Sequence, residues 1–522
     1  MARIFSAVVL AIATVAGAMF AGPASAQTPP GVLVVGQIAE PKSLDPHAVT
    51  AVNDFRILVN LYDGLVRFKD GTLEVEPALS ESYDVSDDGL TYTFQLRDGI
   101  TFHDGTPFNA EAVVFNFERM LNEDHPFHDT GPFPLSFFFS AVDKVEAVDD
   151  ATVRFTLKEP YAPFLSNLAY PTGLIVSPAA VEAGGADFGR NPAGTGAFKF
   201  ADWTPNQRVV LEKNADYWDG APPLEAVVFR PITDANTRLA EMLSGGIDVM
   251  VETPPDAVAQ FRDDAAFTVY EQAGPHLWFL ILNTKEGPFA DKRIRQAANY
   301  AINKGALTKD ILQGTAEVAA GPTPPAFAWA HDDTLEPYPY DPEKAKALLA
   351  EAGYDGTPVT FYVTEGGSGM LDPVAMGTAI QADLEAVGMK TEIETYEWNT
   401  YLGLVNPGLE GKADMAEMAW MTNDPDTLPF LTLRSEALPS EGGFNSGYYS
   451  NPEVDTLLEE ARRATDQDER ATLYKKMQEI VADDAPWVFV ANWKQNAVTN
   501  DRVEGFKLQP SFFLMLQDVA KN

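Results

Sequence analysis

Residues 194–250 constrain the fold of this chain more than any other stretch. They open on GTGAFKF, in which Gly194 and Gly196 predict a sharp turn, and they include an aromatic loop, NADYWDG. Three segments have the apolar alternation and the flanking turn residues of strands: 198–200, 209–211 and 227–232. A helical period then predicts a helix that ends at Gly245 and Gly246. We therefore expect a unit in which strands and helices are mixed.

The remainder of the chain carries further signals of the same kind. Asn109, Asp341 and Asn451 are each followed by a helical apolar pattern, and each side chain is suited to capping a helix N-terminus. Alternating apolar residues predict strands at residues 92–96 and 153–157. The pair Pro254 and Pro255 is interpreted as a linker. These elements extend the mixed pattern over most of the chain.

Length and charge limit the possible partners. The 522 residues suggest about three compact units, at roughly 150 residues per domain. A hydrophobic fraction of 45% is typical of a globular protein. The formal net charge of -39 would repel nucleic acids and anionic membranes, so we expect neither as a partner.

Residues 1–26 have the composition of a signal peptide. Arg3 supplies a positive start, residues 4–20 form an apolar run, and residues 24–26 give an A-x-A cleavage signal before Gln27. The alternative is a membrane anchor, because about 17 apolar residues reach the lower limit for a transmembrane helix. The cleavage signal and the polar residues after it favour removal.

The sequence contains no cysteine. Disulfides, thiolate metal sites and cysteine nucleophiles are therefore excluded, and so is a lipid anchor on a cysteine after the signal peptide. The sequence also lacks G-x-S-x-G, H-E-x-x-H and a Walker lysine motif. With 76 acidic residues, carboxylate pairs arise by chance and do not indicate catalysis. We predict no cofactor, no metal site and no enzymatic activity.

Several motifs occur together at a specific spacing. These are GTG followed by an aromatic residue two positions later, N-x-D-Y-W, S-G-x-I-D and, earlier in the chain, NLYDGLV. In these motifs the chain resembles the family 5 extracytoplasmic solute-binding proteins of ABC importers, which include peptide-, dipeptide- and nickel-binding proteins. The resemblance covers nearly all of the chain after the signal peptide.

The resemblance implies an α/β, two-lobe periplasmic binding protein fold with a ligand cleft between the lobes. Lobe I would comprise residues 27–278, with an inserted α+β subdomain at about 61–189. Lobe II would comprise residues 279–487, and residues 488–522 would return to lobe I. We expect the lobes to close around a bound solute by a hinge motion.

The implied function is delivery of a small, peptide-like solute to ABC permease subunits in the inner membrane, by a monomeric periplasmic protein that is not a lipoprotein. Two alternatives are open. One is a binding protein for a non-peptide solute such as a nickel chelate, and the other is a secreted hydrolase that uses the same cleft.

The most informative polar loop is W-M-T-N-D-P-D, which begins at Trp420. In peptide-binding relatives the tryptophan lines the pocket, and an aspartate three positions later binds the ammonium group of the ligand. Here that position is Asn423, and Asp424 follows, so Asp424 would bind the ammonium only if the loop is shifted by one residue. The alternative is that Trp420 simply ends a core strand. Dipeptide-binding relatives also carry an arginine for the ligand carboxylate, but residues 366–375 contain neither Arg nor Lys.

Five other residues are candidate ligand contacts by resemblance. Trp398 matches a cleft aromatic, and His276 and Trp278 lie where the chain passes between lobes. Glu40 lies in a loop beside the cleft, and Phe138 belongs to an aromatic run that would close over the ligand. Packing in the core is the alternative for the aromatic residues.

Overall fold

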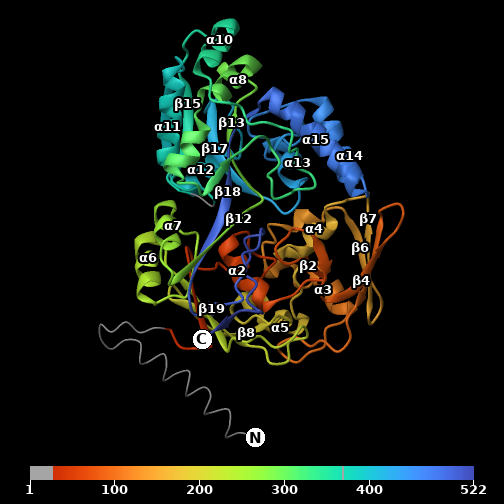
Figure 1. Ribbon diagram of the computed structural model, residues 1–522. Helices are drawn as coiled ribbons and strands as arrows, with labels where there is room; N and C mark the ends of the chain where they lie inside the picture. The colour runs from red at the N-terminus through yellow and green to blue at the C-terminus, as the bar shows by residue number, and fades with distance from the viewer. Residues whose placement is uncertain (1–27, 367–368) are drawn as a thin grey trace.

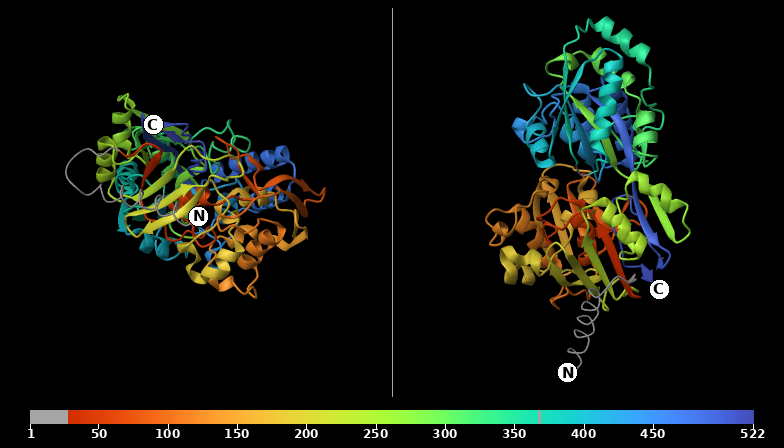
Figure 2. Two further views of the ribbon diagram at one scale, coloured as in Figure 1. Left: turned by 90° about the horizontal axis from the view of Figure 1, so that it is seen from below. Right: turned by 90° about the vertical axis from the view of Figure 1, so that its left-hand side faces the viewer.

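The computed structural model describes residues 28–366 and 369–522, which form two lobes (Figures 1 and 2). The predicted signal peptide lies outside the described residues. The two-lobe α/β fold implied by the resemblance is confirmed. No helix among the described residues combines the length and the apolar character needed to span a membrane.

Lobe I is the lower lobe in Figure 1 and contains both ends of the described chain. Its strands follow one another across the sheet in the order β11 (Val249–Val251), β1 (Val32–Gln37), β10 (Ala226–Pro231), β9 (Arg208–Lys213) and β8 (Phe198–Thr204). β12 (Phe267–Ala273) also belongs to it, and its helices are α2 (Val52–Leu61), α6 (Ala235–Ser244) and α7 (Pro255–Arg262). The strands predicted around the GTG motif are therefore present.

An inserted subdomain packs on one side of lobe I (Figure 1). Its antiparallel sheet has the order β4 (Ser80–Val85), β5 (Thr91–Leu96), β7 (Thr152–Leu157) and β6 (Val142–Asp149). The hairpin of β2 (Val66–Phe68) and β3 (Val75–Pro77) precedes it, and its helices are α3 (Ala110–Leu121), α4 (Phe164–Ala169) and α5 (Pro178–Gly184). The alternating residues of β5 and β7 bury their apolar side chains, as their period predicts.

Lobe II has its own sheet, with two apolar cores on its two faces. Its strands are β16 (Thr391–Tyr396), β15 (Val359–Thr364), β17 (Met415–Met421), β13 (His276–Leu282), β18 (Trp487–Asn500) and β14 (Ala316–Val318). The longer helices are α8 (Lys292–Ala301), α10 (Pro342–Ala352), α11 (Pro373–Ala386), α12 (Trp398–Val405), α14 (Pro452–Arg463) and α15 (Gln467–Asp484), and α13 (Thr427–Thr432) is shorter.

The strand β18 belongs to both lobes. Its first part pairs with β13 in lobe II, and its last part, from Lys494, pairs with β12 and β11 in lobe I. The chain also passes between the lobes at Gly274 and Pro275, which connect β12 to β13. The predicted boundary between residues 278 and 279 falls inside β13, all of which pairs with β17 in lobe II. The two connections therefore lie side by side (Figure 1).

Local sequence explains where the helices begin. The Asn109 side chain accepts a hydrogen bond from the Ala112 backbone N–H at 3.0 Å, and Asp341 accepts one from Lys344 at 2.9 Å. The predicted starts of α3 and α10 are thereby confirmed. The interpretation of Pro254 and Pro255 as a linker was wrong, because Pro255 is the first residue of α7, where its missing N–H costs no helical hydrogen bond.

The GTG turn lies against the end of α2. A Cβ atom on Gly194 would lie 2.2 Å from the Leu61 carbonyl oxygen, so only glycine permits this approach. Beside it, the half-buried Asp63 accepts hydrogen bonds from Thr195 at 2.8 Å, Tyr217 at 2.9 Å and Trp218 at 3.0 Å. Burial raises the pKa of Asp63. The NLYDGLV, GTG and aromatic-loop motifs thus form one packed unit.

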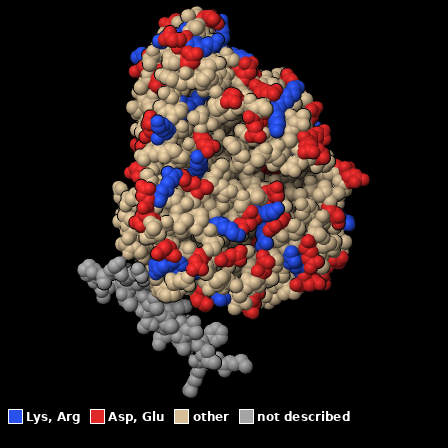
Figure 3. Space-filling view, in the orientation of Figure 1, with Lys and Arg blue, Asp and Glu red and all other residues tan. Residues whose placement is uncertain are grey.

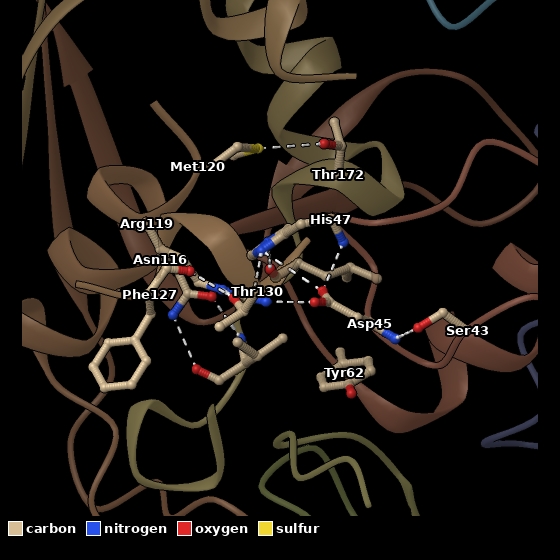
Figure 4. Close-up of polar contacts among 12 residues, drawn as sticks. Ser43, Asp45, His47, Tyr62, Asn116, Arg119, Met120, Phe127, Thr130 and Thr172 are labelled. Carbon is tan, nitrogen blue, oxygen red and sulfur yellow. Dashed lines mark hydrogen bonds and ion pairs between the residues drawn. The ribbon is translucent and has the colours of Figure 1, made fainter. Parts of the chain in front are cut away.

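A buried ion pair joins the loop after β1 to the inserted subdomain (Figure 4). Arg119 of α3 donates to Asp45 at 2.5 Å and to Thr130 at 2.9 Å. His47 donates from Nε2 to the Leu174 carbonyl at 2.9 Å, and burial lowers the pKa of His47 to about 4. The histidine is therefore neutral at pH 7, and this cluster fixes the chain just before Thr50.

Charged side chains cover both lobes on the face drawn in Figure 3. Acidic side chains are spread over this face instead of forming one patch. A net charge of -39 that is spread in this way favours solubility.

Candidate functional site

A cavity of about 240 Å³ lies where the two lobes meet. Lobe I contributes Thr50, Val52, Tyr170, Glu252 and Phe512, and the connections between the lobes contribute His276 and Trp493. Lobe II contributes Gly369, Trp398, Leu402, Asn406, Met418, Ala419, Trp420, Met421 and Phe444. The lining is mostly aromatic or aliphatic, with a few polar groups, as is usual for sites that bind small molecules.

The end of β17 forms one wall of the cavity. Trp420 is opposite Leu277 and Met421 is opposite His276 in the antiparallel pair of β17 and β13. The Trp420 ring meets the Phe444 ring edge to face, with centroids 5.2 Å apart. These contacts fix the orientation of the indole, so Trp420 both ends a strand and lines the cavity.

Trp398 also lines the cavity, from the first residue of α12. Its ring is stacked on Tyr401, with an interplanar angle of 11° and centroids 5.9 Å apart. Tyr401 is fully buried and its hydroxyl donates to the Glu417 carbonyl. The indole is therefore supported from behind by a rigid core residue.

His276 lines the cavity at the start of β13. Its ring meets Trp493 edge to face at 5.6 Å. Burial is the main reason that its pKa falls to about 3, so the imidazole is neutral at physiological pH. Gly369, with φ of 74°, passes so close that a Cβ there would lie 2.3 Å from Nε2 of His276. Glycine at 369 is needed for this approach and for the left-handed backbone.

Asn423 and Asp424 do not line the cavity. Asp424 accepts hydrogen bonds from Arg470 at 2.7 Å and from Ser166 at 3.1 Å. Asn423 donates to Asn167 at 2.7 Å. Since both carboxylate oxygens of Asp424 already have partners in the protein, the geometry gives no support to the predicted contact with a ligand ammonium.

The bonds of Ser166 and Asn167 belong to a set that links α4 and the preceding loop of the inserted subdomain to lobe II, which we term the interlobe clasp. The clasp also includes the Ala162 N–H donating to the Arg462 carbonyl at 2.8 Å, and Arg463 donating to Glu159 at 3.1 Å. The clasp holds the two lobes together where α4 lies below α13 and α14 of lobe II in Figure 1.

Three other predicted residues lie outside the cavity lining. Trp278 is only 2% exposed and packs in the lobe II core with side chains of α11. Phe138 is buried behind Tyr170, with ring centroids 5.7 Å apart. Glu40 accepts hydrogen bonds from the Trp203 indole at 2.8 Å and the Asn206 N–H at 2.7 Å. Tertiary packing accounts for all three residues.

Glu252 lines the cavity but belongs to no motif that predicts a site residue. This residue follows β11 directly, and its carboxylate Oε1 lies 2.7 Å from Nη1 of Arg56. Its φ of 53° is uncommon for a residue other than glycine and costs roughly 1–3 kcal/mol. The available signal was a carboxylate between an apolar strand, VMV, and two prolines.

Comparisons with known proteins agree with this architecture. Residues 74–438 match the family model described as bacterial extracellular solute-binding proteins, family 5 middle. The chain is 34% identical over 511 residues to di/tripeptide-binding protein 2 of Pseudomonas aeruginosa, covering 94% of this chain and 95% of that one. It is 37% identical over 470 residues to heme-binding protein A of Haemophilus influenzae, covering 86% and 85%.

Two solved structures show the same fold. HbpA2 of Haemophilus parasuis superposes with a TM-score of 0.84 at 31% identity, covering 94% of this chain and 100% of that one. The periplasmic binding protein DppA of Helicobacter pylori, in complex with the peptide STSA, gives a TM-score of 0.80 at 33% identity, covering 94% and 98%.

Proposed function

This chain belongs to the bacterial extracellular solute-binding proteins of family 5, and we propose that it binds a peptide or peptide-like solute in the cavity between its lobes. The observation that carries this proposal is the shared lining: aromatic side chains of both lobes face one cavity at the point where the chain passes between them. Such a site is buried when the lobes meet and is exposed when they separate.

The size of the cavity supports a small solute. A dry cavity of about 150 Å³ accommodates benzene, and pockets for drug-sized ligands usually begin near 300 Å³. The 240 Å³ found here fits a solute of about dipeptide size. Trp398 and Trp420 would form apolar surfaces for its side chains, and His276 would offer a neutral polar contact.

The proposal extends to location and partners. The protein would act in the periplasm after cleavage before Gln27, without a lipid anchor, as a monomer that delivers its solute to the permease subunits of an ABC importer. Relatives carry names that support this assignment, including a dipeptide-binding protein of Escherichia coli and an ABC transporter-associated periplasmic binding protein. We expect no chemical conversion of the solute.

The test is native mass spectrometry of protein purified from its host without denaturation, followed by calorimetric titration of the released solute and of a library of dipeptides and tripeptides. We expect a bound peptide-like mass and 1:1 binding. A nickel chelate in the released fraction, or turnover of the bound solute, would refute the proposal and favour one of the alternatives.

A further inference from the structure

Glu252 is the only cavity-lining side chain in the described part of the chain that carries a charge at neutral pH. The other lining groups are aromatic, aliphatic or neutral polar side chains. Residues 367 and 368, which adjoin the lining residue Gly369, are glycine and serine in the sequence and have no ionisable side chain. One carboxylate therefore sets the charge preference of the cavity.

The backbone around Glu252 is held firmly. Asn496 of β18 accepts a hydrogen bond from the Thr253 N–H at 2.7 Å and donates to the Thr253 carbonyl at 3.2 Å. Arg238 donates to the Glu252 carbonyl at 3.3 Å. These bonds keep Glu252 at its positive φ, which is a backbone conformation that glycine adopts far more easily. The carboxylate is thus presented to the cavity by a rigid turn.

Arg56 lies behind the carboxylate and not beside the solute. The Arg56 side chain is 3% exposed and is absent from the cavity lining, whereas the Glu252 side chain is 18% exposed. Arg56 contacts Oε1, and no described group hydrogen-bonds to Oε2. A cation at Oε2 would be closer to the carboxylate than to either nearby guanidinium, that of Arg56 or that of Arg238, which donates to the Glu252 backbone carbonyl.

A carboxylate on the solute would have no cationic side chain to pair with among the described lining residues. No described lining residue is an arginine or a lysine, and an uncompensated anion is costly to remove from water, the more so beside another carboxylate. We infer that the cavity selects a solute with one cationic nitrogen group, an ammonium or a guanidinium, which binds Glu252 while the apolar body lies among Trp398, Trp420 and Phe512. This inference rests on the proposed function, because it specifies the charge of the solute.

The experiment compares three probes with the same dipeptide body and different charges: Phe-Leu amide, with one ammonium; N-acetyl-Phe-Leu amide, which is neutral; and N-acetyl-Phe-Leu, with one carboxylate. Calorimetric titration of the wild-type protein should show Phe-Leu amide binding roughly 10- to 150-fold more tightly than the neutral probe, because hydrogen bonds to charged groups contribute that much. The anionic probe should bind most weakly.

The decisive variant is Glu252→Gln. Its amide oxygen can still accept from Arg56, so folding is preserved, but its charge is lost. The affinity ratio of cationic to neutral probe should fall to near 1, which a purely structural role of Glu252 would not produce. The control is Glu271→Gln, since Glu271 also pairs with an arginine, Arg262, but lies outside the cavity lining. It should keep the wild-type ratio.

An unchanged ratio in Glu252→Gln, or wild-type protein that prefers the neutral or anionic probe, would overturn the inference. The solute released from purified protein provides a second readout, because it should carry a cationic nitrogen and no carboxylate. A released cation that is not peptide-like would refute the proposed substrate class while supporting the charge preference. A released peptide with a free carboxylate and no cationic group would refute the charge preference while supporting the proposed substrate class.

Discussion

Replacement of Asp424 by asparagine separates a structural role of this residue from a role in ligand binding. The Asp424 side chain is 3% exposed and its partner Arg470 is 9% exposed, so the ion pair is almost completely removed from water. Loss of one partner of such a pair costs roughly 3–5 kcal/mol. Two features reduce this cost: the asparagine oxygen still accepts from Arg470, and the Asp426 carboxylate remains near the same guanidinium.

We therefore expect Asp424→Asn to lower the free energy of unfolding by about 2–3 kcal/mol. At an unfolding entropy of about 2.1 cal/mol/K per residue, a cooperative chain of about 500 residues shifts its midpoint of thermal unfolding by about 1 °C per kcal/mol, which gives a decrease of roughly 2–3 °C. Calorimetric scans of the ligand-free protein measure this shift. Asp333→Asn is the control, because the Asp333 side chain is 85% exposed, and it should leave the midpoint unchanged.

The result that would refute this reasoning is specific. If Asp424→Asn unfolds at the wild-type temperature but no longer binds a cationic solute, Asp424 is a ligand residue, as the sequence comparison with peptide-binding relatives suggested. A lower midpoint with affinity for Phe-Leu amide reduced less than tenfold would support the structural role.

Four further predictions follow from other contacts. Ser166→Ala removes a clasp bond to Asp424 and should weaken solute binding about 5- to 10-fold by calorimetry, whereas Ser435→Ala, which breaks a hydrogen bond within lobe II, should not. Trp420→Ala should weaken binding of charged and neutral probes alike, by at least about tenfold; an effect on one probe alone would contradict an apolar role. Burial raises the pKa of Asp54 from an ordinary value of 3.8 to about 7. The stabilisation by its protonated carboxyl is therefore complete below about pH 4 and is lost as the pH rises through 7. In urea unfolding, the free energy of unfolding of Asp54→Asn should differ less between pH 5 and pH 8 than that of the wild type. Small-angle scattering should give a smaller radius of gyration with bound solute than without it, and identical profiles at saturation would reject hinge closure.

Local sequence was sufficient for much of the fold. The caps at Asn109 and Asp341 act over three residues, so their effect can be derived from the sequence without knowledge of the tertiary structure. Strand periods predicted β5 and β7 for the same reason. The start of α7 at Pro255 was not predicted. Proline is favoured at the first position of a helix, but two successive prolines are also typical of a loop between elements.

The site was only partly predictable. Trp420, Trp398 and His276 were identified because each lies in a motif at the end of an element, and all three line the cavity. The ion pair of Asp424 could not be predicted, because its partner Arg470 lies 46 residues further along the chain and nothing in the loop indicates it. Glu252 was missed because its significance comes from the cavity in front of it and from Arg56 behind it, which only the fold brings together.

The strand β18 has a consequence for any attempt to produce the lobes separately. Lobe II lies between the two connections as one continuous segment, yet its sheet needs the first half of β18 between β13 and β14. A fragment cut before β18 would expose the backbone of β13 along a buried, apolar edge that invites pairing with other chains. A fragment cut after β18 would carry the surplus segment from Lys494, which has lost β11 and β12 as partners. Neither cut leaves a closed sheet, and a cut within β18 at Lys494 would remove from lobe I the segment that pairs with β11 and β12, so no single cut leaves both lobes with complete sheets.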